Sequence, residues 1–191
     1  MAGAAHADPL VDRIVEQLEA SPSGCSAVAP GNPRRKTMEA DIARFETLAP
    51  VPQDVQFEVK DCEVDGFVHK GQTIVVSVRL TRLPPSQRFF ILAHELGHIQ
   101  LQHHAAVSSF VAAAVSGAAD EAAARAAVAS GLSAVSHRNE LAADAYAVRL
   151  MQQAGYDPLD AARLFDRIGT TQDNATHPSA RRRAGAIRAL L

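Results

Sequence analysis

The chain has 191 residues, of which 47% are hydrophobic and 21% are charged, so it can bury one substantial core and has the composition of a soluble globular protein. Its formal net charge of -2, with two tyrosines and no tryptophan, gives no electrostatic reason to expect a nucleic-acid partner. The most apolar run, residues 105–119, is shorter than the ~20 residues that a membrane-spanning helix needs. We therefore expect neither a nucleic-acid partner nor an integral membrane segment.

Cys25 and Cys62 are the only cysteines, and their spacing matches no zinc-finger or redox pattern. Two alternatives stay open: a disulfide formed in an oxidising compartment, or two unpaired thiols. Residues 5–8, AHAD, resemble the end of a signal-peptidase site but follow no hydrophobic signal core. The chain as it stands is therefore expected in the cytoplasm, and in the periplasm or outside the cell if a signal peptide has been removed.

The first 50 residues indicate two helices joined by a flexible linker. Asp8 and Pro9 form a cap followed by a proline at the first helical position, and apolar residues recur with helical spacing over residues 8–20. Residues 21–36 are rich in Pro, Gly and Ser, which is typical of an exposed linker, and a second helix is expected over about 37–48. We assign residues 1–50 to this N-terminal part and 51–191 to the functional domain, both within one compact unit.

Three short β-branched runs between residues 53 and 83 predict a small antiparallel sheet. Their sequences are VQFEVK, GFVHK and TIVVSVRL, and Asp-Gly and Lys-Gly separate them. Leu83-Pro84-Pro85 ends the sheet, and Ser86 is placed to cap the helix that follows.

The rest of the chain is predicted to be helical. The alanine-rich residues 105–133 favour two helices, or one helix broken near Gly117, with Glu121 and Arg125 spaced to pair across a turn. Three more helices are expected: one over about 137–153, one from Asp157-Pro158 to about 168, and a last one after Thr176-His177-Pro178. The predicted fold class is α+β, mainly helical, with the small antiparallel sheet before the helix described next.

Residues 88–104, RFFILAHELGHIQLQHH, place two histidines four residues apart inside an apolar run. On an α-helix His94 and His98 project from one face, and zinc accepts imidazole nitrogens at about 2.0 to 2.1 Å. Glu95 can reach a water activated by the metal without binding the metal itself. Three ionisable groups in an apolar helix are costly to bury unless a metal and hydrogen bonds satisfy them. Gly97 allows another segment to approach closely. The alternative is a pair of hydrogen-bonded histidines on an exposed face.

A catalytic zinc site needs a third protein ligand and one open position. Glu140 and Asp144 are four residues apart in NELAADAYAVRLM, where one carboxylate can bind the metal and the other can orient a ligand histidine. The surrounding alanines and leucines argue for a buried helix, and an exposed acidic pair is the alternative. His103 and His104 follow His98 by five and six residues, do not share its helix face, and are expected at the surface.

HELGH, NELAADAYAVRLMQQAGYDP and THPSARRR, in this order, resemble the HtpX-like and CAAX-prenyl-protease-like family of gluzincin metallopeptidases over most of residues 65–188. The family pattern runs HExxH, a glutamate followed by Ala-Asp or a similar pair, Ala-Gly-Tyr-Asp-Pro, and His-Pro with an arginine beyond it. The matching positions here are His94, Glu95, His98, Glu140, Asp144, residues 155–158, His177, Pro178 and Arg183.

The resemblance implies a zincin-like metallopeptidase domain over residues 51–191. It implies one Zn²⁺ per chain held by His94, His98 and Glu140, a polypeptide substrate, and Glu95 as general base. The strand GQTIVVSV, residues 71–78, would border the cleft and pair with an extended substrate.

Two further residues receive roles from the resemblance. His177 would lie near the metal, where it stabilises the developing oxyanion or fills the open coordination position. A histidine bonded to backbone near a helix start is the alternative. Arg183 is expected to be a structural ion-pair partner in the wall of the site.

Residues 86–104 are also similar to the ImmA/IrrE-like regulatory peptidases, which share the HExxH and glutamate plan. Ala-Gly-Tyr-Asp-Pro and His-Pro favour the first family, and both families predict the same metal and reaction.

Three functions follow from these observations. The first is a soluble zinc endopeptidase acting on unfolded or exposed polypeptide segments in protein quality control. The second is a binding or assembly factor that receives partner strands at its sheet edge and has a structural or latent zinc site. An intact Glu95 argues against a purely structural site, since such a site needs no base. A latent site stays open, because His177 or Cys62 could fill the open coordination position. The third, a nucleic-acid binder using residues 181–183, is disfavoured by the net charge.

Overall fold

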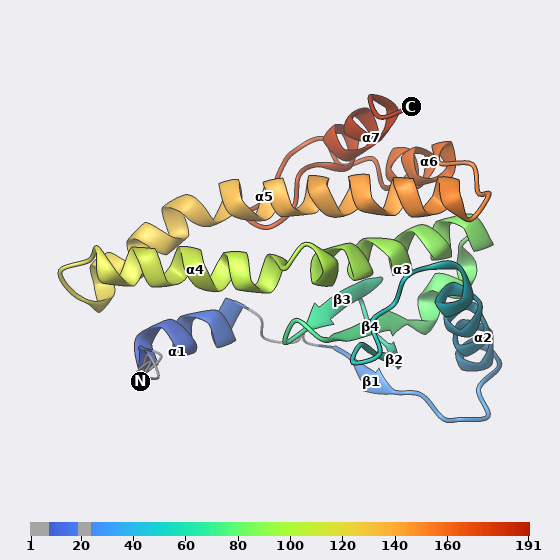
Figure 1. Ribbon diagram of the computed structural model, residues 1–191, viewed down its shortest axis with the longest axis horizontal. Helices are drawn as coiled ribbons and strands as arrows, with labels where there is room; N and C mark the ends of the chain where they lie inside the picture. Colours follow the sequence, from blue (N-terminus) through green and yellow to red (C-terminus); the bar gives the residue numbers. More distant parts are fainter. Residues whose placement is uncertain (1–7, 19–23) are drawn as a thin grey trace.

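A computed structural model describes residues 8–18 and 24–191 of the chain (Figure 1). Part of the AHAD stretch, the last two residues of the first predicted helix and the start of the predicted linker lie outside these described residues. The helices are α1 (Pro9–Leu18), α2 (Pro33–Leu48), α3 (Pro85–Gln100), α4 (His103–Ser116), α5 (Glu121–Gln153), α6 (Leu159–Ile168) and α7 (Ala180–Arg188). The strands are β1 (Ser26–Ala27), β2 (Gln56–Asp61), β3 (Gly66–His69) and β4 (Thr73–Ser77), and a short 3-10 helix, η1 (Val78–Arg82), follows β4.

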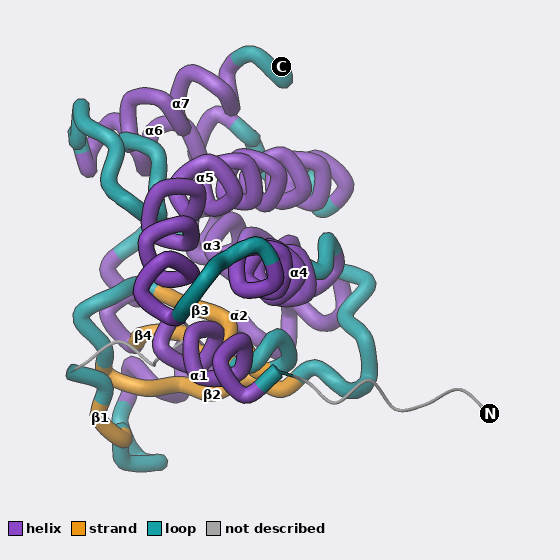
Figure 2. The backbone as a smooth tube through the Cα atoms, turned by 90° about the vertical axis from the view of Figure 1, so that its left-hand side faces the viewer, coloured by secondary structure: helices purple, strands orange, loops and turns teal. Residues whose placement is uncertain are grey.

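The elements are stacked in layers. In Figure 2 the sheet lies on one side of α3, α5 lies on the other side, and α6 and α7 lie beyond α5. Helix α2 packs against α3, η1 and β2, so it covers the end of the sheet near the start of α3. None of the helices in the described ranges is long and apolar enough to cross a membrane.

The sheet has the predicted position but not the predicted strand directions. Its order is β1-β2-β4-β3, with β1–β2 and β3–β4 antiparallel and β2–β4 parallel. The expectation of an antiparallel sheet was therefore wrong for its central pair. The chain leaves β2, crosses to the far edge as β3, and returns through a tight turn at Lys70 and Gly71, whose φ angles of 50° and 68° are both left-handed. The returning strand β4 is consequently inserted beside β2 in the same direction.

The predicted linker contains a short strand. Ser26 and Ala27 pair with Asp61 and Lys60 at the outer edge of β2. A disulfide between Cys25 and Cys62 ties the same two segments together, so the first of the two alternatives for the cysteines is the one present.

Three helix starts differ from the sequence expectations. Helix α2 begins earlier, because the side chain of Asn32 caps Pro33–Leu48 by accepting from the backbone amides of Arg34 and Arg35. Ser86 lies inside α3, does not cap it, and donates to Asp160 at 2.6 Å. Ser179 rather than Thr176 caps α7.

The alanine-rich region breaks where it was expected to. Helix α4 ends at Ser116, Gly117 follows as its cap, and α5 begins after Asp120. Helix α5 is longer than predicted, because residues 121–153 form one continuous helix that joins two expected ones. The pair between Glu121 and Arg125 is confirmed at 2.8 Å.

The main core forms around α3, in which every residue from Phe89 to Gly97 is buried. Burying one such large apolar side chain stabilises the fold by roughly 1.5 to 3 kcal/mol. A smaller cluster holds α1 against α4 and α5, where Ile14 packs with Val111 and Val128.

The close approach predicted at Gly97 is confirmed. A Cβ atom built there would lie 3.2 Å from the Cα of Ala143 and 3.2 Å from the ring of Tyr146, both on α5. The missing side chain therefore lets α5 pass directly over the turn of α3 that carries His94 and His98.

We predict that Gly97→Ala lowers the free energy of unfolding by about 1 to 3 kcal/mol, because the added methyl group overpacks the contact between α3 and α5. Gly185→Ala is the matched control, since a Cβ there meets no atom within 4 Å. Urea denaturation should show no loss for this exposed helical position, where alanine is intrinsically preferred by up to ~1 kcal/mol. Equal stability of both variants would contradict the packing argument.

Candidate metal centre

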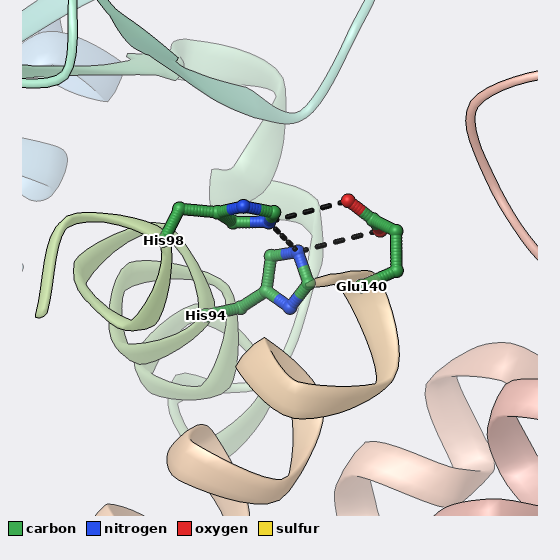
Figure 3. A group of neighbouring side chains, drawn as sticks. All are labelled: His94, His98 and Glu140. Carbon is green, nitrogen blue, oxygen red and sulfur yellow. Dashed lines mark hydrogen bonds and ion pairs between the residues drawn. The ribbon is translucent and has the colours of Figure 1, made fainter. Parts of the chain in front are cut away.

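Helices α3 and α5 bring three metal-ligating side chains together. His94 and His98 project from one face of α3, and Glu140 reaches them from α5 (Figure 3). The two Nε2 atoms are 3.1 Å apart, and Glu140 Oε1 lies 3.2 Å from His98 Nε2. The second oxygen, Oε2, lies 3.6 Å from His94 Nε2. The carboxylate therefore faces both imidazoles, as the sequence predicted.

These separations fit a small tetrahedral ion. Ligands held about 2.0 to 2.1 Å from zinc at tetrahedral angles are roughly 3.3 Å apart, close to the distances between these three donors. Glu140 Oε2 is also buried and accepts no hydrogen bond from the described residues, although Arg183 Nη1 lies 3.0 Å away. A buried carboxylate oxygen without a hydrogen bond is costly, and a cation at this position would satisfy it.

Asp144 and Arg183 support the ligands from behind. Asp144 Oδ1 lies 2.9 Å from His94 Nδ1, so it can fix the ring with Nε2 directed at Glu140. Arg183 binds both oxygens of Asp144, through Nη2 at 2.6 Å and Nε at 2.8 Å, while its Nη1 approaches Glu140. Its guanidinium group also lies over the ring of Phe165, 4.3 Å from the ring centroid. The structure thus places Arg183 in the wall of the site, as expected.

The network keeps the buried carboxyl groups of Glu140 and Asp144 ionised. Burial alone would raise the pKa of Glu140, but His94, His98 and Arg183 hold it well below its usual range. Burial opposes ionisation of Asp144 as well, and its bonds to Arg183 and His94 lower its pKa despite that. Burial lowers the pKa of His94, but the bond to Asp144 and the charge of Glu140 outweigh this effect and raise it.

Glu95 lies beside the three donors and is buried, and burial raises its pKa. A Cβ atom at Gly66 would lie 3.2 Å from Glu95 Oε1, so the start of strand β3 passes directly over this carboxylate. The absence of a side chain at Gly66 allows this close approach.

His177 lies on the rim of the site. Its Nε2 is 3.8 Å from Glu140 Oε2, and its side chain is 54% exposed. Its Nδ1 lies 2.8 Å from the hydroxyl of Thr176, and its backbone amide donates to Asn174 in the loop before α7. The structure therefore brings His177 near the three donors without burying it among them.

His103 was expected at the surface, and the structure shows that this was wrong. Its side chain is buried, and its Nδ1 lies 3.0 Å from His98 Nδ1. Burial, followed by the neighbouring His98, lowers the pKa of His103 to about 4. The sequence argument assumed a helix that continues past Gln100, whereas α3 ends there and a new helix begins at His103. His104 is exposed, as expected.

A cleft of about 380 Å³ runs over the three donors. One side is formed by Gly66, Phe67 and Val68 of strand β3, and the other by α4 and α5, with His177 at the rim. The strand at the cleft is therefore β3 and not β4, which lies inside the sheet. Cys62 cannot fill an open coordination position, because it is bonded to Cys25.

Residues 32–191 match the model of peptidase family M48. The chain belongs to this family. M48 is a family of zinc metallopeptidases, and His94, His98 and Glu140 form a group in this chain that could hold the metal. No curated protein matches the chain significantly.

The family match also decides between the two resemblances. The matched residues include the Ala-Gly-Tyr-Asp-Pro and His-Pro elements that follow HExxH. These elements favour the HtpX-like family over the ImmA/IrrE-like peptidases. The matched region begins at residue 32 and so includes α2, and the predicted division of the chain at residue 51 stays a prediction.

We predict that Arg183→Met lowers the free energy of unfolding of the metal-free M48 domain by about 3 to 5 kcal/mol, because it leaves Glu140 and Asp144 as buried charges without their cation. Arg188→Met in the same helix removes an exposed pair with Asp166 and should cost at most about 1 kcal/mol. Urea denaturation with a chelator present measures both changes, and similar small losses would show that the buried network contributes little.

Proposed function

We propose that this M48 domain is a zinc-dependent endopeptidase that binds one zinc ion per chain through His94, His98 and Glu140. The convergence of two imidazole nitrogens and one carboxylate, with Glu95 beside them, supports this proposal. Zinc with three protein ligands is the arrangement found in catalytic sites, because it leaves one position open. When bound, the ion would act as a Lewis acid on a peptide carbonyl and activate a water molecule for attack.

Glu95 is the general base in this proposal. Its carboxylate takes a proton from the attacking water and passes it to the nitrogen of the leaving amine as the carbon–nitrogen bond breaks. The raised pKa caused by its burial suits a group that must both accept and release a proton near neutral pH. His177, exposed on the rim 3.8 Å from Glu140, is placed to donate a hydrogen bond to the developing oxyanion.

The proposed substrate is an extended polypeptide. Within residues 8–18 and 24–191, strand β3 pairs with β4 alone, so it is an edge strand of the sheet, and it borders the cleft. Its free side can pair with the backbone of a substrate, which recognises an extended chain rather than a folded surface. Unfolded or exposed segments meet this requirement, so protein quality control is the proposed role.

The Cys25–Cys62 disulfide supports an oxidising compartment as the place of action, since such bonds persist in the periplasm and outside the cell. A latent site, with His177 as a fourth ligand, is the second candidate function. The short distance from His177 to Glu140 favours it, while the exposure of His177 and the presence of Glu95 favour the active enzyme.

We predict that Glu95→Gln leaves zinc binding intact and abolishes hydrolysis of casein, because the amide cannot accept a proton from water. Zinc content per chain and the rate of casein cleavage should be measured on the same preparations. Thr81→Ala, remote from the cleft, is a suitable purification control and should keep wild-type activity. Cleavage by the Glu95 variant at the wild-type rate would refute the role of Glu95.

We also predict that zinc stabilises the protein according to its concentration. Each tenfold increase in free zinc above the dissociation constant should raise the free energy of unfolding by about 1.4 kcal/mol. Magnesium, which prefers oxygen ligands, should have little effect. The His94→Ala variant should lose the dependence on zinc in the same denaturation series. Equal stabilisation of this variant would place the metal elsewhere.

A further inference from the structure

His103 is not among the residues on which the resemblance rests, yet it contacts a proposed zinc ligand. We propose that His103 is a positioning residue for the metal site: it accepts a hydrogen bond from His98 and holds that ring with Nε2 directed at the metal. This inference rests on the proposed zinc site. The observation that carries it is the 3.0 Å separation between the Nδ1 atoms of His98 and His103.

The backbone between the two helices creates this contact. Helix α3 ends at Gln100, and Gln102 has a left-handed backbone conformation with φ of 55°. The change in direction allows α4 to begin with His103 turned back toward α3. The two rings meet edge to face, with their centroids 4.9 Å apart, and the His103 side chain is buried. The next residue, His104, is exposed.

The protonation states required by metal binding assign the donor and the acceptor. His98 Nε2 faces Glu140 and His94, so its lone pair is the one available to a metal. A neutral imidazole that binds through Nε2 carries its proton on Nδ1. His98 Nδ1 must then donate, and His103 Nδ1 must accept, with the proton of His103 on Nε2.

The two ligand histidines are therefore held by different groups. Asp144, a carboxylate from α5, lies at Nδ1 of His94, and His103, a neutral imidazole from α4, lies at Nδ1 of His98. Groups that hydrogen-bond to a metal ligand in this way fix the orientation of the ligand ring. Removing one typically costs 10- to 100-fold in metal affinity. The His103 contact thus couples the start of α4 to the metal site.

Three variants separate this role from simple packing. His103→Leu keeps a buried side chain but removes the acceptor, whereas His103→Asn keeps an acceptor close to the position of Nδ1. His104→Leu changes the neighbouring exposed histidine. We expect the dissociation constant for zinc, measured by chelator competition, to rise 10- to 100-fold in His103→Leu and less than threefold in the other two variants.

Proton NMR of the cobalt-substituted protein gives a second and more specific readout. Each ligand histidine that binds through Nε2 should give one shifted, exchangeable Nδ1 proton signal, so the wild type should show two. In His103→Leu one signal should broaden or disappear, because the proton of His98 is no longer held in a hydrogen bond. The signal from His94 should remain, and His103→Asn should restore both.

Equal zinc affinity and two unchanged proton signals in His103→Leu would overturn the inference, as would equal losses in His103→Leu and His103→Asn. Either result leaves the proposed zinc peptidase standing. A wild-type protein that binds neither zinc nor cobalt would overturn the proposed function, and this inference with it.

Discussion

Burying two carboxylates one turn apart on α5 is the constraint on which the site depends. Glu140 and Asp144 are almost entirely hidden from solvent, and like charges at this spacing repel each other. Arg183 from α7 and the histidines of α3 surround them, so three helices must meet at one place for the charges to be tolerated. The same packing of the helices also brings the metal donors together. Folding and formation of the site are therefore one process.

The sheet topology and two glycines, Gly97 and Gly66, allow the close packing around the site. Gly97 lets α5 come close enough for Glu140 to reach the histidines, and Gly66 lets β3 pass over Glu95. The parallel pairing of β2 and β4 moves β3 to the edge of the sheet, where it borders the cleft. The disulfide between Cys25 and Cys62 secures the segment that leads from β2 to β3.

Much of the site could be predicted because its residues obey helical spacing. His94, His98 and Glu95 share one short stretch of α3, and Glu140 and Asp144 repeat the four-residue interval on α5, so local periodicity was sufficient to group them. Joining the two groups rested on the need of a catalytic zinc site for a third ligand and on the resemblance, because no local pattern states which helices pack against each other. The role of Arg183 came from the resemblance, and the structure places its guanidinium group beside Asp144 and Glu140.

The predictions that were wrong share a different cause, because each depends on a feature that local sequence patterns do not specify. The burial of His103 depends on a single left-handed residue between two helices, and Gln102 carries no sequence signal for it. The parallel central pair of the sheet depends on where β4 inserts, which short β-branched runs do not specify. Ser86 resembled a helix cap but bonds to Asp160, 74 residues away, through a tertiary contact that no local rule includes.

Anomalous diffraction at the zinc absorption edge from crystals of the zinc-loaded protein tests the central claim most directly. The account predicts one strong peak between His94 Nε2, His98 Nε2 and the carboxylate of Glu140, at about 2.0 to 2.2 Å from each. A peak at another group of residues, or density that shows Glu140 directed away from the ion, would contradict it.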